Sequence, residues 1–207
     1  MRRAALPALM ISLALLSGCA GAGKWEDKLS DRREELSKAE RVSFTAEISA
    51  DLGDRVFDCT LLCERSGGET VMTVTEPELA AGVTARIREK DAVLSFDGVE
   101  LSVGALPEGG VSPFASVPLL MDALTGDYAF NFNEETTESG LDTVCAESYV
   151  SDEQSALIWY DAGTLTPVHG QIVSGGRVCI RCDISDFTSE SGTDEAEHDA
   201  NMGGDRS

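Results

Sequence analysis

A strict alternation of apolar and polar residues recurs along most of this chain, and it constrains the fold more than any other feature. In the segment Val42 to Ala50, apolar residues occupy every second position and polar residues lie between them. This period predicts a β-strand with one buried and one solvent-exposed face. Turn-forming residues separate the segments, and Asp97-Gly98 is a strong signal for a two-residue hairpin. We therefore expect a meander of antiparallel hairpins.

Eleven such strands are predicted, six before a Gly- and Pro-rich loop at Gly104 to Val111 and five after a short helix. Antiparallel sheets of this many strands curl and close partly around helices, which buries one face. The segments are Val42 to Ala50, Phe57 to Glu64, Thr70 to Thr75, Val83 to Glu89, Ala92 to Phe96, Val99 to Val103, the stretch containing Tyr128, Phe130 and Phe132, Leu141 to Val150, Ser155 to Tyr160, Thr166 to Ser174, and Arg177 to Phe187.

Two helices are predicted. Apolar residues at helical spacing and a charged opposite face indicate a helix from Trp25 to about Arg41 that lies on the sheet. A second, short helix follows the central loop. Either Ser112 or Ser116 can cap it, and Ser116 is the better choice because Pro118 then falls in the first turn. The helix Val117 to Leu124 is apolar on nearly all sides, so it should be buried over the sheet.

The N-terminus has the layout of a bacterial export signal. Arg2 and Arg3 precede an apolar run from Ala4 to Leu16, which is shorter than the roughly 20 residues that span a membrane. Leu16-Ser17-Gly18-Cys19 resembles a lipobox. That resemblance implies cleavage after residue 18 and diacylglycerol on Cys19, with stable anchoring on the extracytoplasmic side of the cell membrane. The alternative is an ordinary cleaved signal with a cysteine there by chance.

The charge limits the kinds of partner. The net charge is −21, and it becomes more negative when the signal is removed. Such a surface repels nucleic acid and anionic lipid headgroups, and it favours solubility and cationic partners. From Thr188 onward acidic residues stand among Gly, Ser and Ala, so residues 188–207 should be a disordered tail.

The cysteines that remain after lipidation are odd in number, so complete intramolecular pairing is impossible. They are Cys59, Cys63, Cys145, Cys179 and Cys182. Zinc bound by Cys59, Cys63, Cys179 and Cys182 is an alternative, because the last two have C-x-x-C spacing. Strand parity disfavours it, since Cys179 and Cys182 point to opposite faces. Buried free thiols are the preferred interpretation.

Motifs for common enzyme classes are missing from the sequence. It contains no G-x-S-x-G, no H-E-x-x-H and no phosphate-binding glycine loop. Of the two histidines, His198 lies in the tail and His169 lies in a predicted strand. We expect no catalytic residues, no metal and no cofactor, and a hydrolase is kept only as the least favoured hypothesis.

The order of elements resembles the half-open barrel of the LolA/LolB family of lipoprotein carriers. Two local pieces are similar to its C-terminal hairpins, namely Ala156-Leu157-Ile158-Trp159-Tyr160-Asp161 and the turn Gly175-Gly176-Arg177. Because this chain carries its own anchor, it is most similar to membrane-anchored forms such as the GerS-type spore-germination lipoproteins. The resemblance implies a mainly β (α+β) fold, an eleven-stranded antiparallel half-open barrel with an N-terminal helix and a short covering helix. The expected parts are a signal peptide (1–18), a lipidated tether (19–24), a LolA/LolB-like domain (25–187) and the tail.

The family's mechanism implies an apolar cavity between the sheet and the covering helix. Its candidate lining residues are Phe44, Phe57, Leu61, Met72, Val74, Leu94, Phe96, Leu120, Leu124, Phe130, Phe132 and Trp159. The same residues also fit an ordinary filled core, because parity does not distinguish the two. The leading hypothesis is a membrane-anchored, non-enzymatic binding module for an exported or cell-envelope protein. The alternative is a carrier or sensor of lipid or lipoprotein acyl chains.

Overall fold

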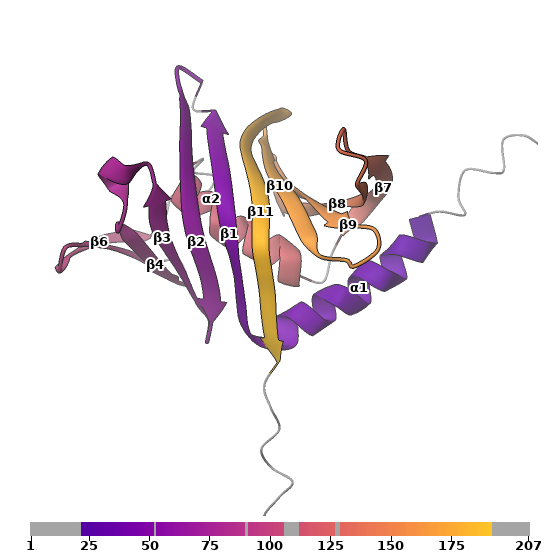
Figure 1. Cartoon of the computed structure of the whole chain (residues 1–207), viewed down its shortest axis with the longest axis horizontal. Coiled ribbons are helices and arrows are strands. Elements are labelled where there is room, and N and C mark those ends of the chain that lie inside the picture. The colour runs from indigo at the N-terminus through magenta and orange to yellow at the C-terminus, as the bar shows by residue number, and fades with distance from the viewer. Residues whose placement is uncertain (1–21, 52, 90, 106–111, 127–128, 192–207) are drawn as a thin grey trace, which may run out of the picture.

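The two-residue alternation of the sequence produces one large antiparallel sheet, with both helices on its concave side (Figure 1). The computed structural model describes residues 22–51, 53–89, 91–105, 112–126 and 129–191. The strands are β1 (Ala39–Asp51), β2 (Val56–Ser66), β3 (Glu69–Glu76), β4 (Thr84–Arg88), β5 (Asp91–Phe96), β6 (Val99–Ala105), β7 (Phe130–Thr136), β8 (Asp142–Ser151), β9 (Gln154–Asp161), β10 (Pro167–Ser174) and β11 (Arg177–Ser191). The helices are α1 (Ala22–Lys38), α2 (Pro113–Thr125) and a 3₁₀ turn, η1 (Glu78–Ala80).

The sheet consists of two meanders joined at its centre. Its order is β6-β5-β4-β3-β2-β1-β11-β10-β9-β8-β7, so the first and last strands of the chain are neighbours. Strands β6 and β7 remain as the two edges, and the sheet does not close on itself. The predicted class, the eleven strands and the half-open barrel with an N-terminal helix and a short covering helix are confirmed.

The hairpin predicted at Asp97-Gly98 joins β5 to β6. Both residues have positive φ angles, 49° and 77°. A two-residue type I′ turn requires this of both central residues, and its twist matches that of the flanking strands. The turn therefore sets the register in which Phe96 lies opposite Val99 and Leu94 opposite Leu101.

Pairing at the sheet centre moves two predicted boundaries. Strand β1 begins at Ala39, which lies opposite Ser191, so α1 ends at Lys38 and not near Arg41. The same pairing carries β11 to Ser191, four residues beyond the predicted end of the domain at Phe187. Backbone hydrogen bonds to β1 thus override the polar composition of residues 188–191. At the other end α1 begins at Ala22, inside the predicted tether. Residues 1–21, including the signal peptide and Cys19, lie outside the described residues, as do Tyr128 and residues 192–207.

Helix α2 is longer than predicted. Ser112 is its N-cap, and its Oγ accepts a hydrogen bond of 3.2 Å from the Ala115 amide. The prediction of Ser116 as the cap was wrong: its hydroxyl donates to the Pro113 carbonyl within the helix. Pro118 therefore lies in the helix interior, where it removes one backbone donor. Burial of the helix against the sheet offsets this local cost, which a propensity rule for proline cannot include.

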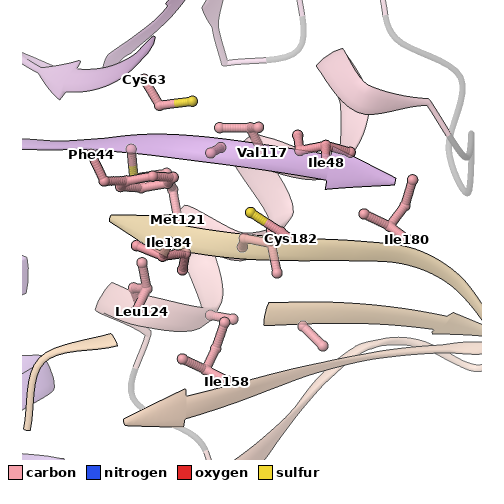
Figure 2. Close-up of a cluster of buried hydrophobic side chains, with 14 of the residues drawn as sticks. Phe44, Ile48, Cys63, Val117, Met121, Leu124, Ile158, Ile180, Cys182 and Ile184 are labelled. Atoms are coloured by element: carbon pink, nitrogen blue, oxygen red, sulfur yellow. The ribbon is translucent and has the colours of Figure 1, made fainter. Parts of the chain in front are cut away.

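The core lies between the concave face of the sheet and the two helices (Figure 2). α2 packs against β1, β2 and β8 to β10, and α1 packs against α2, β1 and β7. Figure 2 shows side chains of β1, β9 and β11 meeting Val117, Met121 and Leu124 of α2. Among the described residues, neither helix has the length and apolar character needed to cross a membrane.

Candidate functional site

The sequence alone did not distinguish a filled core from an apolar cavity, and in the structure side chains fill the concave interior. Half of the candidate lining residues are at most 5% exposed, namely Phe44, Leu61, Met72, Val74, Leu120 and Leu124. Leu120 is the clearest case: a Cβ built at Gly170 of β10 would lie 3.0 Å from its Cδ2 atom. The helix and the sheet are therefore in direct contact there, and these residues form a packed core.

Trp159 lies on the opposite face from the one we predicted. Along β9 the side chains of Ile158 and Tyr160 are fully buried, whereas Trp159 points to the outer face. Its indole donates to a Glu135 carboxylate oxygen at 2.9 Å, and its ring meets His169 edge-on at 5.1 Å between centroids. The apolar run from Ala156 to Trp159 hides the strand's parity in the sequence, which explains the error.

The other candidate residues divide into two groups. Leu94 and Phe132 are half-buried and pack against the core. Phe57, Phe96 and Phe130 are exposed, each near the end of a strand. Phe96 belongs to a larger apolar surface.

That surface, which we call the β5–β6 surface, consists of Phe96, Val99 and Leu101. Their exposed fractions are 52%, 70% and 60%. The strand registers place them on the concave face, because Leu101 lies opposite Leu94 and Leu94 opposite the buried Ala85. The surface is thus a direct continuation of the core face.

Neither helix covers the β5–β6 surface. α2 contacts β1, β2 and β8 to β10, and Figure 1 shows the β6 edge projecting away from both helices. β6 is also an edge strand, so among the described residues no strand neighbours one row of its backbone N–H and C=O groups. Acidic Asp97 lies in the turn of this hairpin, whereas Glu100, between Val99 and Leu101, points to the opposite face. The site thus combines an exposed strand edge, apolar side chains and negative charge.

Val99 and Leu101 were absent from the predicted lining residues, although the sequence contained a usable signal. Both alternate with polar residues in a predicted strand, as the core residues do. The sequence does not reveal how much of the sheet α2 covers, and this decides whether a residue on the concave face is buried.

Surface depressions are found on the outer face, at the ends of the helices and at the turn between β5 and β6. One of about 460 Å³ is lined by polar and charged residues of β1, β2 and β11, including Glu47, Asp58 and Arg181. His169 lies at its border and its Nδ1 is 2.6 Å from Asp183 Oδ1. His169 and Asp183 therefore form a hydrogen bond on the partly exposed outer face of the sheet, where the sequence predicted a surface or sheet-facing imidazole.

The cysteines form no disulfide among the described residues. Burial raises the pKa of the Cys59 thiol to about 11 and that of Cys182 to about 12, and it also raises the pKa of Cys63. Cys145 is buried as well, opposite Trp159 in the pairing of β8 with β9, whereas Cys179 is partly exposed on the parity opposite to Cys182.

Metal ligation by these thiols is not supported by their arrangement. Across the described ranges no three His, Cys, Asp or Glu side chains are grouped so that they could hold a metal ion. The C-x-x-C pair of the zinc alternative is divided between the two faces of β11, as strand parity predicts.

Among the comparisons with known proteins, the search of solved structures returned similar chains. No protein-family model matches the sequence, and no curated protein matches it. Similar solved structures include a LolA superfamily protein from Nitrosomonas europaea, at 12% identity over 84% of this chain and 96% of that chain, with a TM-score of 0.40. LprF from Mycobacterium bovis is 14% identical over 81% and 95% of the two chains, with a TM-score of 0.45. A chain of the complex between the CwlD amidase of Clostridioides difficile and the GerS lipoprotein is 12% identical over 91% and 98%, with a TM-score of 0.38. All three TM-scores are below 0.5 and all three identities are below 25%, so these likenesses assign neither a family nor a role to this chain.

Proposed function

We propose that this chain is a membrane-anchored exported lipoprotein whose β5–β6 surface binds an exported or cell-envelope protein without catalysing a reaction. The observation that supports this most directly is the exposure of Phe96, Val99 and Leu101 on the same face as the core. Exposed apolar side chains gathered at one place commonly mark a binding surface. Diacylglycerol on Cys19 would hold the domain at the extracytoplasmic side of the membrane.

The chemistry of the surface favours a protein as the ligand. An edge strand offers backbone hydrogen bonds that a polypeptide can complete by adding a strand, and a lipid chain cannot use them. The negative charge of the whole chain, −21, and of Asp97 in the turn beside the surface favours a partner with basic residues beside its apolar ones.

A lipid carrier needs an open apolar cavity, and the packing of the described interior residues favours a protein ligand instead. The side chains of Leu120, Met121 and Leu124 occupy the concavity and are fully buried. Acyl-chain binding there would require α2 to move away from the sheet.

The test compares two single substitutions in the same strand. Leu101→Glu places a charge on the β5–β6 surface, and Ser102→Glu places the same charge on an exposed neighbour that points to the opposite face. Both positions are exposed, so both variants should remain folded. We expect cross-linking and native mass spectrometry of the full chain from its own membranes to detect a protein partner with the wild type and Ser102→Glu, and to lose it with Leu101→Glu. Co-purified lipid in place of a protein, or a partner retained by Leu101→Glu, would refute the proposal.

A further inference from the structure

A second feature of the molecule lies on its other half, between α1 and strands β8 and β9. Arg33 of α1 is 3% exposed and points to the sheet side of the helix. Its Nη2 atom donates to Ser148 Oγ at 2.6 Å, whereas Nε and Nη1 have no acceptor. Because Nε carries one N–H and Nη1 two, most of the hydrogen-bonding capacity of this buried cation is unused.

The neighbouring unsatisfied groups are also donors. The buried side-chain nitrogen and oxygen atoms without a partner are Arg32 Nε, Arg33 Nε, Arg33 Nη1 and Tyr160 Oη, counted within the described residues. Tyr160 is fully buried. Burial raises the pKa of its phenol, while the positive charge of Arg33 and its proximity as a hydrogen-bond donor act to lower it, although no Arg33 nitrogen reaches Tyr160 Oη in good hydrogen-bond geometry. At pH 7 the phenol therefore carries a proton that it can donate.

Such a cluster is unexpected in this composition. The chain has 37 acidic and 16 basic residues. Arg32 pairs with Glu35 at 3.0 Å, but Arg33 has no ion pair in the described part of the chain. Burying an unpaired guanidinium is costly, and the cost falls when an anion accepts its hydrogen bonds.

We propose that Arg33, Tyr160 and Ser148, where α1 meets strands β8 and β9, bind an oxyanion, a carboxylate or phosphate group, which approaches from the side of Ser148. A guanidinium matches the oxygen spacing of both groups, and a phenol and a hydroxyl add neutral donors. This site is separate from the β5–β6 surface, which is formed by the other half of the sheet.

Ser148 links the cluster to the surface. It lines a depression of about 300 Å³ at the C-terminal end of α2, together with Leu119, Asp122, Ala123, Gly126, Tyr149 and Val150. The one carboxylate of this wall, Asp122, is paired with Arg65 at 2.8 Å. The apolar part of the wall suits a short alkyl chain, so the oxyanion can be a free solute or the head of a lipid-like acid.

The experiment is a thermal unfolding titration of the full chain in nonionic detergent at pH 7. Phosphate and acetate test small solutes, octanoate tests an acid with an alkyl chain, and chloride at equal ionic strength corrects for general salt effects. A bound oxyanion at 100 times its dissociation constant should raise the wild-type midpoint by about 5 °C or more. A response to octanoate alone identifies a lipid-like acid, and a response to phosphate or acetate identifies a small anion.

Matched variants assign the effect to the site. Arg33→Met should abolish the rise and, in chloride, should unfold at the same temperature as the wild type or higher. Arg55→Met, which removes an exposed arginine, should retain the full rise. Tyr160→Phe, which loses a single oxygen atom, should reduce the rise in the unfolding midpoint. If Arg33→Met does not fold, this variant tests the proposal in its place. No oxyanion effect beyond chloride, or an equal effect in the wild type and the site variants, would overturn the proposal and assign these donors to buried water.

Discussion

Leu120 offers the most direct test of whether the concave face is a closed core. The side chain is fully buried, and α2 approaches β10 so closely that an added Cβ at Gly170 would be 3.0 Å from Leu120 Cδ2 and 3.5 Å from Ile158 Cδ1. Leu120→Ala should therefore leave a cavity and lower the free energy of unfolding by about 2 to 5 kcal/mol. For a domain of this size the midpoint should fall by roughly 4 to 20 °C.

The facing glycine provides a stricter form of this test. Gly170→Ala alone should destabilise by about 1 to 3 kcal/mol, because its methyl group presses on Leu120. In the double variant the same methyl group lies in the space that Leu120→Ala vacates. The two changes should therefore cost about 0.5 to 3 kcal/mol less together than the sum of their separate effects.

Urea unfolding of the full chain measures all three variants, with half-buried Leu119→Ala as the control that should cost less. An additive double variant would show that α2 does not pack on β10 as described. A small loss for Leu120→Ala, combined with binding of a fluorescent fatty acid by the wild type, would support an open lipid site and contradict a closed core.

The remaining predictions concern individual residues. Cys179 should react with a thiol reagent before the buried thiols, which react only on unfolding; equal protection of all five would contradict the assignment of faces. The buried thiols are Cys59, Cys63, Cys145 and Cys182. Their pKa values are raised above the 9.0 of a free thiol, so they stay protonated in the fold while unfolded thiols ionise, and unfolding free energy should decline above about pH 9. Ser112→Ala should cost about 0.5 to 2 kcal/mol in urea unfolding through loss of the N-cap, and an unchanged stability would argue against that cap. Cys19→Ser should abolish lipid attachment, checked by mass spectrometry and membrane fractionation; unchanged membrane association would count against the anchor.

Helix ends and turns show where local signals suffice and where they fail. The turn at Asp97-Gly98 was predictable because the required positive φ angles depend on those two residues alone. The start of α2 was not, because Pro118 argued for a later cap and only the packing of the helix on the sheet offsets its cost. The composition of residues 188–191 likewise predicts a disordered tail, but in the structure they extend β11 by pairing with β1.

The sequence by itself determined the number of strands, their antiparallel hairpin connections and the parity of most core residues, because a period of two and the turn residues between segments are local properties. Only the tertiary structure decided which concave residues are covered, since that depends on where α2 lies relative to both halves of the sheet. It buries Leu120 and leaves Leu101 exposed, although both are apolar residues of predicted elements. The unpaired Arg33 also required the structure, because in sequence it is one of several charged residues on a helix, and its lack of an acidic partner among the described residues is a fact of three-dimensional contacts.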